Sequence, residues 1–159
     1  MAECGGFMYL QERLIGGGMT MRGGILPISE HAGAKTEKWF GTVNEREISY
    51  EMCGAIEGEC RYTGSLVRFG YAEFTLKGTE FAPIERWLSG VEPTVRGHEF
   101  HYFDSTNNGS AFTAKKPLSS RSWDCMIHTE KMLAGFPHLY YRSCPAIVRW
   151  FVGACGGGQ

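Results

Sequence analysis

The feature that most restricts the fold is a cysteine near the start of the chain, flanked by small residues. In Ala2-Glu3-Cys4-Gly5-Gly6, a small residue stands two positions before and two positions after the thiol. This spacing suits a nucleophile on a sharp turn between a strand and a helix, where strained backbone angles leave no room for larger side chains. The bland alternative is a cysteine in an unstructured tail beside a glycine turn, and the spacing alone does not decide between the two.

An apolar segment follows the cysteine and predicts a short helix. Phe7, Leu10 and Leu14 recur at the spacing of one helical face, and glycines from Gly16 onward end the pattern. The positive end of such a helix would point at Cys4 and lower the pKa of its thiol. We therefore expect a strand, a turn and a helix around Cys4, with thiolate present at neutral pH.

Composition excludes several classes of protein. The 159 residues suffice for one domain, and 16 basic residues against 17 acidic ones argue against nucleic-acid binding. No apolar stretch reaches the roughly 20 residues of a membrane span, and no secretory signal is evident. Six cysteines occur without a C-x-x-C pair, which favours reduced thiols over disulfides or a structural zinc site. We expect a cytoplasmic protein without nucleic-acid or membrane partners and without a bound metal.

The rest of the chain predicts strands more than helices. Residues 16–47 are rich in glycine and are interpreted as an insertion or lid, with a short helix near Trp39. Pro145 begins an amphipathic helix with Ile147, Val148, Phe151 and Val152 on its apolar face. Between them we expect strands at residues 48–58, 66–76 and 95–105, a turn at 108–109, a weak hairpin within 112–133 and an extended segment at 135–143.

A nucleophilic cysteine needs a base, which is usually histidine. His138 follows Pro137 in an extended segment before the last helix, a common place for a base. His98 and His101 lie in one predicted strand and face opposite sides, so that one is buried and the other exposed. For the same reason a metal site built from these two and a cysteine is a poor alternative. The other two histidines, expected to be solvated, are His31 and His128.

Three stretches together resemble one family. AECGGFMYL, RGHEFHYFDS and GFPHLYYRSCPAIVRWFV, with GYAEFTL among them, resemble the C-terminal glutaminase domain of cobyrinate a,c-diamide synthase. Nickel-sirohydrochlorin a,c-diamide synthase is similar in the same motifs and stays open as an alternative. The resemblance spans residues 1–155 apart from the insertion at 16–47, and residues 156–159 are expected to form a flexible tail.

The resemblance implies a cysteine–histidine glutaminase, an enzyme that hydrolyses glutamine. Cys4 matches the nucleophile that forms a γ-glutamyl thioester, and His138 matches the histidine that activates the thiol and protonates the departing ammonia. Tyr140 stands where the family has a second histidine and many class I amidotransferases have an orienting glutamate, a role that tyrosine cannot fill. Glu99 is the candidate for an orienting or substrate contact, and its alternative is a buried ion pair in a packed strand.

The resemblance also implies partners beyond this sequence. The released ammonia would amidate the a and c carboxylates of a corrin, after a separate domain has activated them with ATP and Mg²⁺. This chain has no phosphate loop of the type G-x-x-x-x-G-K-[ST], so we expect no cofactor in it. Three residues before Cys4 are too few for the strand of a nucleophile turn, so we expect a fragment that is inactive unless a partner chain supplies the front half.

The fold expected from the resemblance is α/β: part of a class I glutamine amidotransferase sheet with flanking helices. An incomplete domain of this kind can look like α+β in isolation. Two rival functions stay open, namely a different cysteine–histidine hydrolase acting on a small amide or ester, and a non-catalytic module that docks on a partner through apolar sheet surface.

Overall fold

The computed structural model describes residues 1–17, 47–77 and 94–156 of the chain. The expectations for the helix near Trp39, for His31 and for most of the 16–47 insertion fall outside these residues. The same holds for residues 157–159 of the expected tail.

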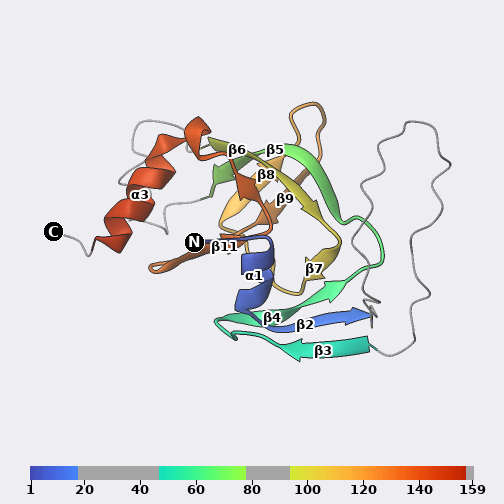
Figure 1. The fold of residues 1–159 in the computed structure, drawn as a ribbon. Helices are drawn as coiled ribbons and strands as arrows, with labels where there is room; N and C mark the ends of the chain where they lie inside the picture. Colours follow the sequence, from blue (N-terminus) through green and yellow to red (C-terminus); the bar gives the residue numbers. More distant parts are fainter. Residues whose placement is uncertain (18–46, 78–93, 157–159) are drawn as a thin grey trace, which may run out of the picture.

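Strands dominate the described residues, and short helices stand near the two ends (Figure 1). The helices are α1 (Gly5–Leu10), the 3₁₀ helix η1 (Tyr141–Ser143) and α3 (Pro145–Cys155). The strands are β1 (Ala2–Glu3), β2 (Gln11–Gly17), β3 (Glu47–Glu51), β4 (Ile56–Tyr62), β5 (Arg68–Leu76), β6 (Thr94–His101), β7 (Phe103–Ser105), β8 (Phe112–Lys115), β9 (Ser122–Cys125), β10 (Ile127–Thr129), β11 (Met132–Gly135) and β12 (His138–Leu139).

The described strands form three sheets. A three-stranded sheet has the order β1-β11-β10, a five-stranded sheet has the order β12-β6-β5-β8-β9, and a four-stranded sheet has the order β3-β2-β4-β7. Most neighbours are antiparallel, but β1 runs parallel to β11 and β2 runs parallel to β4. Figure 1 shows α1 beside β11 and above the four-stranded sheet, so the segment that carries Cys4 lies between two sheets.

Two apolar clusters hold these layers together. The larger one joins the five-stranded sheet to α3, where Ile147 and Trp150 are buried. The smaller one surrounds Phe7 of α1, which is fully buried and packs edge-on against Phe136 with ring centroids 5.0 Å apart. Burying a side chain of this size contributes about 2–3 kcal/mol, so Phe7 fixes α1 and the turn before it.

The predicted helix over residues 7–14 is wrong in its second half. The helix ends at Leu10, and Gln11 begins β2, which pairs with β3 on one side and β4 on the other. Leu14 therefore packs as a strand residue against the cluster around Phe7. Tertiary pairing overrides the helical spacing here, as it often does in short segments.

The later segments agree better with the sequence. The strands at 66–76 and 95–105 are confirmed as β5 and as β6 with β7, whereas the region 48–58 divides into β3 and part of β4, and the weak hairpin at 112–133 is four strands. The closing helix is confirmed as α3, although Val148 and Val152 of its predicted apolar face are 40% and 62% exposed. Within the described ranges, no helix combines the length and apolar character needed to cross a membrane.

The expected fold class is confirmed only at a coarse level. The described residues combine helices with mixed sheets, and their predominantly antiparallel pairing resembles the α+β appearance expected of a partial domain. A class I glutamine amidotransferase topology stays a prediction.

Gly97 is where β6 and β12 come closest, and it provides a test of this packing. A Cβ atom at Gly97 would lie 2.3 Å from the carbonyl oxygen of His138 and 3.0 Å from the ring of Phe74. We expect Gly97→Ala to push β12 away from β6 and to lower the free energy of unfolding by about 1–3 kcal/mol, measured by urea denaturation. Gly16→Ala in β2 is the control, since nothing lies within 4 Å of the added atom. Equal stability of the two variants would contradict this account.

Candidate functional site

Cys4 lies on a strand–turn–helix elbow, as the sequence predicts. Its backbone has φ 46° and ψ −108°, a left-handed conformation that non-glycine residues rarely adopt. A Cβ atom on Gly6 would lie 3.5 Å from the Cβ of Ala2, so the two small positions face each other across the turn. Such a conformation costs about 1–3 kcal/mol and tends to persist where the surrounding packing holds it.

The expectation that three residues cannot form the preceding strand is wrong. Ala2 and Glu3 form β1 and pair in parallel with Ala134 and Gly135 of β11. The backbone N–H of Cys4 continues this pairing by donating to the carbonyl oxygen of Gly135 at 2.9 Å. Parallel pairing with a strand about 130 residues away gives the elbow its support.

The pKa of Cys4 moves in the direction opposite to the sequence expectation. Burial raises the pKa of its thiol, the negative charges of Glu3 and Glu99 raise it further, and the backbone N–H of Gly5 lowers it only in part. The favourable end of α1 is therefore outweighed by desolvation and by two carboxylates. At neutral pH the thiol is protonated, so its use as a nucleophile requires a base.

His138 is the sequence-predicted base, and the structure places it beside the elbow segment. It begins β12, lies opposite His98 of β6 and stacks on that ring with centroids 4.9 Å apart. Its Nδ1 lies 3.7 Å from Oε2 of Glu3, the residue next to Cys4. In the part of the chain that the structure describes, no hydrogen bond joins the Cys4 sulfur to the His138 ring.

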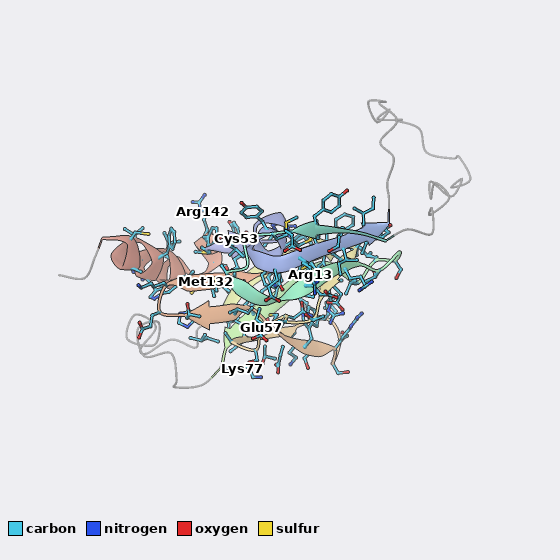
Figure 2. All side chains as sticks on the ribbon, turned by 90° about the horizontal axis from the view of Figure 1, so that it is seen from below. Arg13, Cys53, Glu57, Lys77, Met132 and Arg142 are labelled. Carbon is cyan, nitrogen blue, oxygen red and sulfur yellow. The ribbon has the colours of Figure 1, made fainter. Side chains whose placement is uncertain are left out.

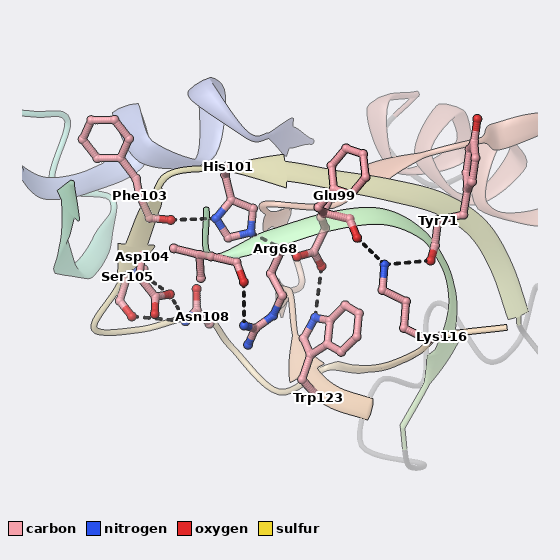
Figure 3. A network of polar contacts seen from close by, with 12 residues as sticks. Arg68, Tyr71, Glu99, His101, Phe103, Asp104, Ser105, Asn108, Lys116 and Trp123 are labelled. Atoms are coloured by element: carbon pink, nitrogen blue, oxygen red, sulfur yellow. Dashed lines mark hydrogen bonds and ion pairs between the residues drawn. The ribbon is translucent and has the colours of Figure 1, made fainter. Parts of the chain in front are cut away.

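Glu99 is buried and belongs to a different network, shown in Figure 3. One of its oxygens lies 3.0 Å from Nε2 of His101, and the other accepts a hydrogen bond from the indole N–H of Trp123 at 3.1 Å. Nδ1 of His101 lies 2.6 Å from the carbonyl oxygen of Phe103. These contacts place Glu99 in a buried, packed strand beside His101, as the alternative interpretation describes, and an orienting or substrate-contacting role of Glu99 stays a prediction.

The network around Glu99 also contains cationic groups (Figure 3). The guanidinium of Arg68 lies 5.2 Å from the ring centroid of Trp123, and Lys116 donates hydrogen bonds to the carbonyl oxygens of Phe69 and Tyr71. Gly70 between those two carbonyls has φ 91°, which turns both toward Lys116 without interrupting the pairing of β5 with β6. These contacts hold the start of β5, which pairs with the strand that carries Glu99.

The remaining expectations for histidine and cysteine can be compared with the structure. His98 is exposed and His101 is buried, which confirms that they face opposite sides of one strand. All six cysteines are free thiols. Among the described residues, no group of three or more histidine, cysteine, aspartate or glutamate side chains is placed to hold a metal ion.

Sequence reasoning missed Glu3, which contacts the His138 segment at three points. Besides the contact with Nδ1, Glu3 accepts a hydrogen bond from the backbone N–H of Leu139 at 3.2 Å and another from the hydroxyl of Tyr141. In the sequence, Glu3 is only the spacer of the cysteine motif. The pairing register of β1 with β11 decides where its side chain lies, and no local pattern shows that register.

The elbow at Cys4 and the imidazole of His138 are linked through Glu3, and a cysteine nucleophile with a histidine base stays the prediction for this site. Comparison with known proteins adds a specific resemblance. The chain is 29% identical over 97% of its length to the cobyrinate a,c-diamide synthase of Picrophilus torridus, and 27% identical over 97% to that of Caldanaerobacter subterraneus subsp. tengcongensis. The enzyme of the same name from Fusobacterium nucleatum is 28% identical over 89% of the chain.

These relatives confirm the resemblance inferred from the sequence. No family model matches the chain. The chain spans about a quarter of the length of the curated relatives it matches, namely 25% and 27% of the first two. The relatives are named as synthases of cobyrinate a,c-diamide.

The raised pKa of Cys4 gives a direct chemical test of the elbow. We expect alkylation of Cys4 by iodoacetamide to be slow at neutral pH and to keep rising with pH beyond about 9, because only the thiolate reacts. Peptide mass spectrometry at each pH separates Cys4 from the exposed Cys53, marked in Figure 2, and from Cys60, whose pKa burial raises to about 11. A Cys4 rate that reaches its plateau below pH ~8 would show a lowered pKa instead.

Proposed function

We propose that this chain is the glutaminase part of a cobyrinate a,c-diamide synthase. The observation that carries the proposal is Cys4 on a strained strand–turn–helix elbow, next in sequence to a carboxylate that contacts the predicted base His138. The similarity to proteins named cobyrinate a,c-diamide synthase supports the same role. The substrate is glutamine, and the product used by the synthase is ammonia.

The protonation state of Cys4 decides how the first step runs. Because the pKa of the thiol is raised, His138 acts as a general base that takes the thiol proton as sulfur attacks the side-chain carbonyl of glutamine. The backbone N–H of Gly5 faces the sulfur and is placed to donate to the oxyanion that forms. His138 then gives its proton to the departing nitrogen, and a γ-glutamyl thioester and ammonia result.

A second step regenerates the enzyme. His138 takes a proton from water as the water oxygen attacks the thioester carbonyl, and the C–S bond breaks. The proton returns to the sulfur of Cys4 and glutamate leaves, so that one glutamine and one water give one glutamate and one ammonia. The same two side chains therefore serve both halves of the reaction.

The use of ammonia requires chemistry that we do not place on the described residues. Ammonia would displace phosphate from a corrin carboxylate that ATP and Mg²⁺ have activated, giving the a and c amides. The described strands and helices contain no glycine-rich phosphate loop, so no step of activation is routed through them. A domain or partner chain that binds ATP and the corrin would carry out that step.

The alternatives weighed from the sequence gain no support from the relatives reported above. Their name favours a corrin over nickel-sirohydrochlorin as the compound to be amidated, and an enzyme over a docking module. A different cysteine–histidine hydrolase would share the elbow and would differ in the compound that acylates Cys4.

Covalent trapping tests the proposed substrate without requiring complete turnover. We expect a diazoketone analogue of glutamine to alkylate Cys4, with excess glutamine protecting it, because both compounds occupy the same site. Mass spectrometry of the intact chain and of its peptides measures the added mass and locates it. Replacement of His138 by Ala is expected to slow labelling about 100-fold or more.

The control variants are Cys4→Ser, which removes the thiol, and Cys53→Ser, which removes an exposed thiol. Labelling of Cys4 by the corresponding analogue of asparagine but not of glutamine would show a different amide hydrolase. Labelling that is spread over Cys53 and Cys155, with no protection by glutamine, would contradict the proposal.

A further inference from the structure

The side chain of Glu3 connects the elbow to the segment that carries His138. Its Oε2 faces Nδ1 of His138 at 3.7 Å, and its Oε1 accepts hydrogen bonds from the N–H of Leu139 at 3.2 Å and from the hydroxyl of Tyr141. The side chain is only 22% exposed. A carboxylate held by two donors and partly shielded from water has few alternative orientations, so its second oxygen stays directed at the imidazole.

We propose that Glu3 is the positioning residue for His138, in the place of the orienting glutamate that the His138–Leu139–Tyr140 sequence lacks. This inference rests on the proposed function insofar as it concerns catalysis. Its structural part, the control of the His138 ring by Glu3, is independent of the substrate. Glu3 directly precedes Cys4, so two consecutive residues supply the orienting carboxylate and the thiol.

A carboxylate at Nδ1 would fix the tautomer of the His138 imidazole. A carboxylate is an acceptor only, so it favours the form of His138 that carries its proton on Nδ1. That form leaves Nε2 unprotonated, and no hydrogen bond within the described residues occupies Nε2. Nε2 is then free to take the proton of a thiol, as in nucleophile–histidine–carboxylate triads on unrelated folds.

The separation of 3.7 Å is longer than a hydrogen bond, which has an N···O distance of about 2.7–3.2 Å. Such contacts are often long without substrate and shorten when the reacting complex forms. The groups around His138 allow this movement: the His98 ring lies against one face, the His138 side chain is 37% exposed, and Leu139 and Tyr141 hold the other carboxylate oxygen of Glu3.

Tyr141 is suited to hold Glu3 because it keeps its proton. Burial raises the pKa of the phenol, and the hydrogen bond to Glu3 and its negative charge raise it further. The hydroxyl therefore keeps its proton and donates to Glu3 at neutral pH. Glu99, the other carboxylate considered, is engaged by His101 and Trp123, and Tyr140 is 57% exposed.

Nuclear magnetic resonance of ¹⁵N-labelled histidine tests the proposal in the full chain, without turnover. In the wild-type protein we expect His138 to carry its proton on Nδ1, whereas Glu3→Gln gives mainly the Nε2 protonated form found in free imidazole. Glu57→Gln, an exposed glutamate of β4 marked in Figure 2, is the matched control and is expected to leave the tautomer unchanged. Tyr141→Phe, which removes one donor to Glu3, is expected to give a mixture.

The outcomes separate this inference from the proposed function. The positioning role is overturned if His138 carries its proton on Nε2 in the wild-type protein. It is also overturned if the tautomer is the same in wild type and in Glu3→Gln. If the variant does not fold, the wild-type spectrum alone decides. Where glutamine is hydrolysed, Glu3→Gln is expected to lower kcat about 100-fold with little change in KM, and Glu3→Asp to restore part of it. If the tautomer depends on Glu3 but glutamine analogues never label Cys4, the positioning role is supported and the proposed glutaminase function is contradicted.

Discussion

The parallel pairing of β1 with β11 is the contact on which the site depends. It involves two residues of β1 and one further hydrogen bond from Cys4 to Gly135, yet it places the elbow, directs Glu3 toward β12 and allows Phe7 to enter the core beside Phe136. Each of these consequences needs the register to be as observed, because a shift by one residue would turn Glu3 and Cys4 to the other side of the sheet.

The two carboxylates Glu99 and Glu3 have separate sets of contacts. Glu99 is held by His101 and by the indole of Trp123, whereas Glu3 contacts His138 over a longer distance and in a more exposed position. Burial raises the pKa of Cys4, and the charges of both carboxylates raise it further. A thiol in these surroundings is mostly protonated at neutral pH, and the protonated form reacts slowly with oxidants.

The sequence is informative where a local rule determines the conformation. The small residues around Cys4 predict the elbow, the alternation in β6 predicts that His98 and His101 face opposite ways, and Pro145 predicts the start of α3. It fails where distant pairing decides. Leu14 has helical spacing but lies in a strand between β3 and β4, and Glu3 acquires its role from a segment about 135 residues away.

The contacts of Glu3 have a consequence for how the protein acquires its site during synthesis. Cys4 and Glu3 are synthesised about 130 residues before Gly135, His138 and Tyr141, the residues that contact the Cys4 backbone and the Glu3 side chain. Contacts of such long sequence separation form late in folding. The turn at Cys4 therefore stays without this support until the segment around residues 135–141 has been synthesised and packs against it.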